Sequence, residues 1–367
     1  VLSCSNSSES ENVIPESPTM EERLQAILDS KIGGDDKLKG VAVSIRISNE
    51  ERWNLVGGVS ETGIPITENM RFGIASITKT AVAATILKLE EEGLLSLDDS
   101  IGDYLNLNLP NIDDSITIFQ LLNHLTGLKG YFQHPDIWPT VENNLDTAIP
   151  HLELANYIGE PLFLPGEQYA YSNSNYLILG LIIEAASQQD VATAMRQRFW
   201  NSLGLNSTYF GSDEAIIGAI AAPWRDNDGN GTLENIGPDF RAAYHSVFYT
   251  AADIFTTARD LSSWSYYLYE GNALSDTSKT KMLNFLDLDT GDPYWSGYGL
   301  GVRRFHFHGR EFWGHTGGMR GYGSFMLYEP ISGLTITMLN NQSRSLNGPL
   351  LRFELVNEML YELLQEF

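Results

Sequence analysis

In the N-terminal part of the chain, the spacing of apolar residues first fits one face of a helix and then fits alternating strand positions. Leu24, Ile27 and Leu28 share one face of a predicted first helix. Alternating apolar positions then predict three strands, the first two joined as a hairpin by a short polar connection. The expected bounds are 18–30 for the helix and 40–47, 53–59 and 70–73 for the strands.

The middle of the chain is mostly helical by the same criterion. We expect one helix to start near Ser76 and to end at Gly93. Further helices are expected over 116–128, 152–159, 177–186, 191–203 and 258–269. The C-terminal third returns to the strand pattern, with strands expected over 297–302, 305–307, 312–314, 323–328 and 334–339 and a closing amphipathic helix over 350–364.

Composition narrows the class of protein. The chain has 367 residues, 43% of them hydrophobic, which is enough for one large domain or two interlocked ones. Its formal net charge of -24 disfavours nucleic acid and anionic membranes as partners. The apolar run at 176–186 contains Glu184 and is too short to span a bilayer.

The start of the chain suggests an exported protein. The only cysteine is Cys4, so no internal disulfide can form, and a polar, serine-rich stretch follows it. This arrangement resembles the end of a bacterial lipoprotein signal, in which the cysteine becomes the lipidated first residue. The alternative is a chance cysteine in a disordered tail. We therefore treat residues 1–17 as a tether with a possible lipid anchor at Cys4.

The predicted helix near Ser76 carries the first candidate chemistry. Ser76 and Lys79 are three residues apart, so a helix would place the amine beside the hydroxyl. The apolar run 81–87 would bury the amine and lower its pKa toward the neutral form, which can activate a serine. A second Ser-x-x-Lys, 278–281, has no apolar helix behind it and is interpreted as a solvated loop or a helix start.

Two further segments could contribute polar groups to one cleft. Tyr171 and Asn173 precede the apolar helix and could supply a proton-shuttling phenol and an amide donor, although residues 104–106 show the same Tyr-x-Asn pattern in a plain turn. His315 and Thr316 lie in the glycine-rich stretch 314–321, where a strand edge can approach a ligand closely.

Two polar features favour structural interpretations. His124 has no metal-type residue spaced with it and is expected to be a hydrogen-bonded structural histidine. Residues 226–231 resemble the first half of an EF-hand loop, but Gly237 stands where a bidentate glutamate is needed, so a turn is favoured over a calcium site. No metal or cofactor is expected.

The three motifs in this order resemble the penicillin-recognising serine hydrolase superfamily. Ser76-x-x-Lys79, Tyr171-Ser172-Asn173 and His315-Thr316-Gly317 are similar to the motifs of class C β-lactamases, tyrosine-type D-alanyl-D-alanine carboxypeptidases and related esterases. The resemblance covers roughly residues 20–367. The sequence lacks a Gly-x-Ser-x-Gly elbow, which disfavours an α/β-hydrolase.

The resemblance implies an α+β fold of the β-lactamase/transpeptidase type. An antiparallel sheet built from both ends of the chain would be flanked by helices, with a large, mostly helical region inserted. The implied division is 18–80 with 291–367 for the sheet domain and 81–290 for the helical domain, with the active site in the cleft between them.

The resemblance also implies a role for each residue. Ser76 would be the nucleophile, and Lys79 and Tyr171 would handle its proton, with the choice of base left open. Asn173 would orient the substrate amide, and the backbone N–H groups of Ser76 and Gly318 would form an oxyanion hole. His315 and Thr316 would line the side that holds the substrate carboxylate, and Arg320 either points inward to that carboxylate or outward to solvent.

The expected function is a D-alanyl-D-alanine carboxypeptidase, a penicillin-binding enzyme located in the periplasm or cell envelope. Class C β-lactamases usually carry lysine where this chain has His315, which favours the peptidase or esterase relatives. Gly318, however, stands where the carboxypeptidases can have a second threonine. The alternatives are a class C-like β-lactamase or family esterase, and a penicillin-binding module that does not turn over. The expected substrates are small peptides, β-lactams or esters.

Overall fold

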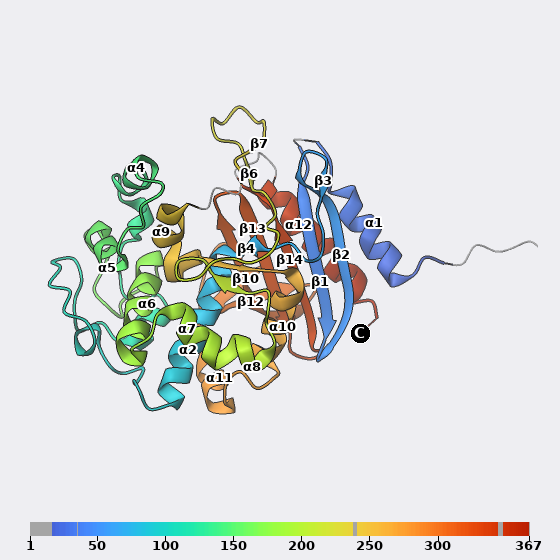
Figure 1. Ribbon diagram of the computed structural model, residues 1–367. Helices are drawn as coiled ribbons and strands as arrows, with labels where there is room; N and C mark the ends of the chain where they lie inside the picture. Colours follow the sequence, from blue (N-terminus) through green and yellow to red (C-terminus); the bar gives the residue numbers. More distant parts are fainter. Residues whose placement is uncertain (1–16, 35, 238–240, 344–347, 367) are drawn as a thin grey trace, which may run out of the picture.

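A computed structural model describes residues 17–34, 36–237, 241–343 and 348–366 (Figure 1). One side of the molecule is a nine-stranded sheet with the order β3-β2-β1-β14-β13-β12-β11-β10-β9. Its strands are β1 (Gly40–Ile47), β2 (Glu50–Glu61), β3 (Ile64–Pro65), β9 (Leu286–Asp287), β10 (Trp295–Tyr298), β11 (Arg303–Phe307), β12 (Arg310–Met319), β13 (Tyr322–Glu329) and β14 (Leu334–Asn340).

The sheet joins the two ends of the chain. Strand β1 pairs antiparallel with β14, with Val43 opposite Met338, so the N-terminal hairpin extends the C-terminal meander. The expected antiparallel sheet built from both ends of the chain is therefore confirmed. Helices α1 (Met20–Ser30) and α12 (Gly348–Leu363) pack against each other beside the sheet (Figure 1).

The helices of the inserted region gather on the opposite side of the sheet (Figure 1). Their bounds are α2 (Thr78–Glu91), α3 (Ile118–Leu122), α4 (Ile137–Asn143), α5 (His151–Leu154), α6 (Asn173–Ser187), α7 (Val191–Met195), α8 (Asn201–Leu203), α9 (Ala242–Ala252), α10 (Ala258–Tyr269) and α11 (Asp276–Met282). Helix α10 packs against β1, β13 and β14, so this part of the region 81–290 covers the sheet. The exact domain boundaries stay a prediction.

Short strands connect the two sides. Strand β4 (Phe72–Gly73) leads to the predicted nucleophile and pairs with β8 (Ile254–Thr256), which also pairs with β5 (Tyr209–Phe210). Strand β6 (Trp224–Arg225) lies between β7 (Glu234–Asn235) and β15 (Gln342–Ser343). The segment before Ser76 is thus held by main-chain hydrogen bonds.

Two hydrophobic cores follow from this arrangement. One core lies between the sheet and the pair α1 and α12, where Leu24, Phe312 and Leu360 are buried. The larger core lies among the helices and includes α2 and α6, whose apolar residues are buried almost all round. A helix enclosed in this way can present a polar side chain to a nearly dry site.

Several expected bounds were wrong for local reasons. Helix α6 begins at Asn173 rather than 177, because the Ser172 hydroxyl caps it by accepting from the Ser174 N–H at 3.2 Å. Helix α3 ends at Leu122 instead of near Gly127, since His124 and Gly127 have positive φ angles of 62° and 73°. Helix α2 begins at Thr78, after a 3₁₀ turn over Ala75–Ile77.

The segment 226–231 forms a compact turn. The Asp226 carboxylate accepts from the N–H groups of Gly229 and Gly231 at 2.8 and 3.0 Å, so its oxygens serve the turn itself. Across the residues described, no group of three or more His, Cys, Asp or Glu side chains is placed to hold a metal. The helices among these residues also include none long and apolar enough to cross a membrane.

Candidate active site

Ser76 lies in a turn that is anchored to both sides of the molecule. Ala75 just before it has a positive φ of 51°, which is unusual for a residue with a side chain. Ile74 bonds to Ile254 through its N–H, and its carbonyl accepts from the Ser324 hydroxyl at 2.7 Å. These contacts hold the strained turn and present Ser76 at the wall of a cavity.

Lys79 is the amine nearest to this hydroxyl. Its Nζ lies 3.3 Å from Ser76 Oγ, 2.8 Å from Asn173 Oδ1 and 2.7 Å from the carbonyl oxygen of Ala251. The side chain is fully buried, and burial together with the charge of Arg303 lowers the pKa of Lys79 well below its ordinary value. The amine is thus favoured in the neutral form.

Tyr171 and Asn173 reach the same place from the start of α6. Lys79 Nζ lies 5.1 Å from the centre of the Tyr171 ring, and Asn173 accepts directly from Lys79. Burial raises the pKa of Tyr171 to about 12, although Arg303 and the interaction with Ser76 act in the opposite direction. The phenol is therefore protonated at neutral pH.

Strand β12 presents alternate residues to opposite faces of the sheet. A side chain at 317 would collide with the Ile74 carbonyl and the Ser324 hydroxyl, which explains a glycine beside the Ser76 turn. At Gly318 an added Cβ would meet no atom within 4 Å, so this position borders open space. Thr316 and Gly318 line the cavity with Ser76 and Tyr171.

His315 faces inward and is fully buried. Its Nδ1 lies 2.6 Å from the Thr316 carbonyl oxygen, and its Nε2 lies 3.3 Å from the Tyr298 hydroxyl. Burial, then the charges of Arg303 and Lys79, lowers the pKa of His315 well below its ordinary value. His315 is not among the residues that line the cavity.

The Tyr298 hydroxyl also meets His124, which completes a buried chain of hydrogen bonds. The Ser172 N–H donates to His124 Nδ1 at 3.2 Å, so Nδ1 is the acceptor and Nε2 carries the proton. His124 Nε2 then donates to Tyr298 at 3.1 Å. Tyr298 in turn can donate to His315 Nε2. The structural role expected for His124 agrees with these contacts.

Arg303 brings a positive charge beside Thr316 and Tyr171. Its Nη1 donates to the Thr316 hydroxyl at 3.2 Å, and its guanidinium lies 5.4 Å from the Tyr171 ring centre and 4.7 Å from that of Trp295. Within the described ranges no carboxylate forms an ion pair with Arg303, and its buried Nε has no hydrogen-bond partner. The cavity that it lines has a volume of about 410 Å³.

The structure brings most of the sequence-predicted residues together. Ser76, Lys79, Tyr171 and Asn173 are linked by the contacts above, and Thr316 and Gly318 line the same cavity. Arg320 is not brought into this cavity, since its guanidinium lies over the Tyr244 ring at 4.9 Å. The sequence interpretation missed Arg303, Tyr298 and the Ala251 carbonyl. The double arginine 303–304, between two predicted strands, was the one available signal for Arg303.

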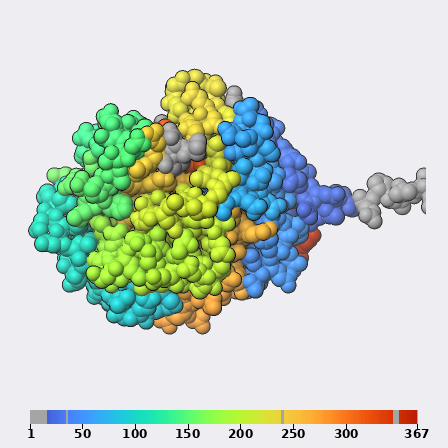
Figure 2. Space-filling model, in the orientation of Figure 1, coloured from blue at the N-terminus to red at the C-terminus, as the bar shows by residue number. Residues whose placement is uncertain are grey.

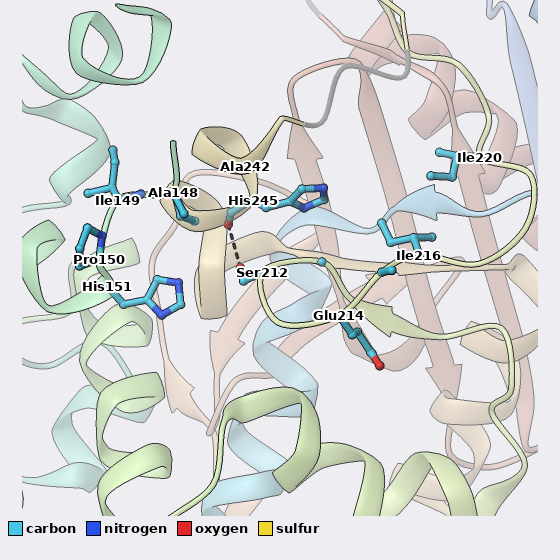
Figure 3. Close-up of a pocket in the computed structure, with 13 residues that line it drawn as sticks. Ala148, Ile149, Pro150, His151, Ser212, Glu214, Ile216, Ile220, Ala242 and His245 are labelled. Carbon is cyan, nitrogen blue, oxygen red and sulfur yellow. Dashed lines mark hydrogen bonds between the residues drawn. The ribbon is translucent and has the colours of Figure 1, made fainter. Parts of the chain in front are cut away.

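A larger cavity of about 660 Å³ lies elsewhere, between the segment 148–151, the loop after β5 and helix α9 (Figure 3). The hollow between these segments is also visible on the surface (Figure 2). Ser212 Oγ in its wall lies 2.9 Å from the carbonyl oxygen of His245 and 2.7 Å from Oδ2 of the buried Asp253, two acceptors for its single proton. With its hydroxyl engaged in this way, Ser212 is not poised as a second nucleophile.

Comparison with known proteins agrees with this geometry. The sequence model of the family named Beta-lactamase matches residues 20–358. Penicillin-binding protein 4* of Bacillus subtilis (strain 168) is 26% identical over 296 residues, which cover 76% of this chain and 62% of that protein. The chain thus spans less than two thirds of this relative. Penicillin-binding protein 4 of Amycolatopsis lactamdurans is 26% identical over 324 residues, covering 82% of this chain and 80% of that protein.

Solved structures share the fold. The D-amino acid amidase from Ochrobactrum anthropi SV3, in complex with L-phenylalanine amide, has a TM-score of 0.82 at 21% identity, covering 95% of this chain and 99% of that chain. At this level of identity the likeness concerns the fold alone. The expected β-lactamase/transpeptidase-like fold is confirmed, and the match over residues 20–358 shows that the chain belongs to the Beta-lactamase family of serine hydrolases.

Proposed function

We propose that the protein is a D-alanyl-D-alanine carboxypeptidase-like peptidase that acts through an acyl-enzyme at Ser76. The observation that carries this proposal is the hydrogen bonding of Lys79. A neutral amine has two N–H groups and one lone pair. The carbonyl oxygens of Asn173 and Ala251, at 2.8 and 2.7 Å, can take both N–H groups. The lone pair is then left for the Ser76 hydroxyl, which lies 3.3 Å away.

The acylation step follows from this arrangement. Ser76 Oγ attacks the substrate carbonyl carbon while Lys79 takes the hydroxyl proton. The oxyanion that forms is held by the N–H groups of Ser76 and Gly318. The C–N bond then breaks, and the leaving amine receives a proton delivered through the Tyr171 phenol. A water molecule hydrolyses the resulting ester by the reverse sequence and restores Ser76.

Arg303 and Thr316 support a substrate with a free carboxylate. The guanidinium is held beside the Thr316 hydroxyl, both line the cavity with Ser76, and no carboxylate among the described residues neutralises the charge. A carboxylate on the leaving residue could accept from both groups. This arrangement favours a carboxypeptidase over a hydrolase for neutral esters. Asn173 would be shared between Lys79 and the substrate amide.

The proposal is tested with paired substrates. Purified protein is given an N-acyl-D-Ala-D-Ala peptide, the same peptide with a C-terminal amide, a short acyl ester, and a fluorescent penicillin. We expect the free-acid peptide to be cleaved faster than its amide, and penicillin to form one stable adduct on the peptide that contains Ser76. Ser76→Ala should abolish both, whereas Ser278→Ala should change neither.

Each alternative has its own outcome in this assay. Turnover of penicillin far above that of the peptides would indicate a class C-like β-lactamase. Preference for the ester or the amide would indicate an esterase or an amidase. Acylation without any turnover would indicate a penicillin-binding module. Any of these results overturns the carboxypeptidase assignment.

The location of the protein is part of the same proposal. A peptidase acting on cell-wall peptides would be exported to the periplasm or cell envelope, and a lipid on Cys4 would hold it there. Cys4 lies outside the residues that the structure describes, so the anchor rests on the sequence pattern alone.

A further inference from the structure

A second arginine, Arg352 from the first turns of α12, lines the cavity at Ser76. Its guanidinium lies directly on Gly323 of β13, because a Cβ at that position would overlap it. The φ angle of Gly323 is not positive, so the glycine is explained by space: an added Cβ would overlap the Arg352 guanidinium and come within 2.6 Å of Asn340 Oδ1. The sequence thus makes room for a cation at the sheet surface.

Arg352 has no acidic partner among the residues that the structure describes. It takes part in no ion pair or hydrogen bond there, and its buried Nε is without a partner. The chain has 47 acidic residues against 23 basic ones, and arginines elsewhere, such as Arg196 and Arg304, are ion-paired. Arg352 is partly buried, and leaving such a cation without an acidic partner in so acidic a chain is costly; a ligand anion would offset that cost.

The two unpaired guanidiniums lie at different places along the cavity. Arg303 donates to Thr316, whose cross-strand partner is Phe325. Gly323, under Arg352, is the diagonal neighbour of Thr316, and such positions lie about 7–8 Å apart. Two anionic groups joined by a short methylene chain can reach both arginines, whereas a single small carboxylate at Thr316 leaves Arg352 unpaired.

The rest of the cavity wall fits such a chain. Tyr294, Phe307 and Phe353 pack together there, with ring centres 4.2 to 5.6 Å apart, and give an apolar surface for methylene groups. Asp292 is the only carboxylate among the described lining residues, and its Oδ1 accepts from the Tyr294 N–H at an exposed turn. The described lining therefore carries two arginines against one carboxylate.

We infer that the cavity takes a leaving residue with two carboxylates, so that the preferred C-terminal residue is acidic, of the glutamate type, rather than alanine. The α-carboxylate is held by Arg303 and Thr316, and the side-chain carboxylate is held by Arg352. This inference rests on the proposed carboxypeptidase function and names its substrate class.

The test uses peptides that differ only in the last residue: N-acyl-D-Ala followed by D-Glu, D-Gln or D-Ala. D-Gln has the shape of D-Glu without the second charge. We expect kcat/KM for the D-Glu peptide to exceed that for the D-Gln peptide by about tenfold or more, the scale of one charge-assisted hydrogen bond. Arg352→Gln should remove this preference, so that the D-Glu and D-Gln peptides have kcat/KM values within about threefold of each other.

Two further variants separate the cation from general damage. Gly323→Ala keeps the charge but displaces the guanidinium, so it should lower the preference for D-Glu as Arg352→Gln does. Arg52→Gln, at an exposed arginine of β2 paired with Glu50, should leave the preference intact. Melting curves of all variants identify any that fail to fold. If Gly323→Ala fails to fold, the result with Arg352→Gln decides the inference.

A binding measurement keeps this inference distinct from the proposed function. N-acetyl-D-glutamate and N-acetyl-D-glutamine are titrated into the Ser76→Ala protein and into its double variant with Arg352→Gln. Tighter binding of the diacid that depends on Arg352 supports the cavity assignment even if no peptide is cleaved, in which case only the proposed activity fails. Equal affinity for both ligands, or a diacid preference that survives Arg352→Gln, overturns the inference.

Discussion

Replacing Lys79 by methionine tests the central assumption about the site, that this lysine is neutral in the folded protein. Methionine has a similar length and cannot carry charge or accept a proton. Lys79 is fully buried, and burial first, then Arg303, lowers its pKa well below the ordinary value. Lys88 on the same helix is partly exposed and ion-paired with Glu91, so Lys88→Met is the matched control.

The expected loss of activity is that of a general base. Removing such a group slows acylation by about 10²- to 10⁴-fold, or about 2.7–5.5 kcal/mol of transition-state stabilisation. In the wild type, only the neutral amine can act as a base, so kcat/KM should rise with pH up to the pKa of Lys79 and then level off below the ordinary value near 10.5. The variant should lose this dependence.

Stability gives an independent measurement with a defined sign. Between the lowered pKa in the folded state and the ordinary value in the unfolded chain, the unfolded chain binds more protons, so stability rises with pH. Relative to Lys79→Met, the wild type should gain up to about 1.4 kcal/mol per pH unit across this window. The absolute stabilities are less informative, because methionine also leaves Asn173 and Ala251 without their donor.

Denaturant unfolding at several pH values between about 6 and 10 measures this slope. Lys88→Met should run parallel to the wild type. Parallel curves for wild type and Lys79→Met throughout the range, together with activity that does not fall toward acid pH, would mean that Lys79 is a charged residue and not the base.

Five other substitutions have defined outcomes. Tyr171→Phe should lower kcat/KM by about 10²-fold with little change in melting temperature, since it removes the phenol proton but keeps the ring against His124 and Tyr298; an unchanged rate would exclude it from proton transfer. Tyr298→Phe leaves His315 Nε2 without its partner and should cost about 1–3 kcal/mol in denaturant unfolding and also lower kcat; unchanged values would show that the chain of histidines is dispensable. Gly317→Ala should destabilise the fold by about 1–3 kcal/mol through overpacking, whereas Gly318→Ala should stay within about 0.5 kcal/mol of wild type, as calorimetry can show; equal effects would contradict the placement of β12. Cys4→Ser should release the protein from membranes in its host, unless the wild type is already soluble and the anchor is absent.

The fold could be predicted from the sequence where the signal was local. Alternating apolar residues revealed most of the strands, and the resemblance supplied their joining into one sheet. Element boundaries failed where a single polar residue decided them. Ser172 caps α6 and starts it before the apolar run, and His124 takes a left-handed conformation that stops α3 early. Neither effect changes the hydrophobic pattern on which the prediction relied.

In the candidate site, too, the contacts between residues near in sequence could be predicted and those between distant residues could not. Ser76 and Lys79 are close because they are three residues apart, and sequence spacing alone can show that. Arg303 meets Thr316 across a strand pair whose register depends on the β11–β12 hairpin, and Tyr298 meets His124 from the other side of the molecule. Such contacts between distant residues follow from topology, so periodicity in one sequence cannot reveal them.

The buried chain of histidines explains how residue 315 can be a histidine here. Because the Ser172 N–H fixes His124 Nδ1 as an acceptor, His124 Nε2 donates to Tyr298. The Thr316 carbonyl can only accept, so His315 Nδ1 carries the proton and Nε2 of the neutral ring can accept from Tyr298. A protonated His315 would lose the hydrogen bond from Tyr298, and burial, then the charges of Arg303 and Lys79, lowers its pKa, so the neutral ring is favoured.

Residue 315 therefore cannot supply the positive charge that a lysine would bring. That charge comes instead from Arg303 on the neighbouring strand, whose guanidinium bonds to Thr316 and stays unpaired within the described part of the chain. The same charge lowers the pKa of Lys79, after the larger effect of burial. One arginine thus links two properties of the site. It offers a place for the substrate carboxylate, and it favours the neutral amine beside Ser76. A bound carboxylate would partly cancel the second effect, so we expect the acid limb of the rate profile to lie at higher pH for kcat than for kcat/KM.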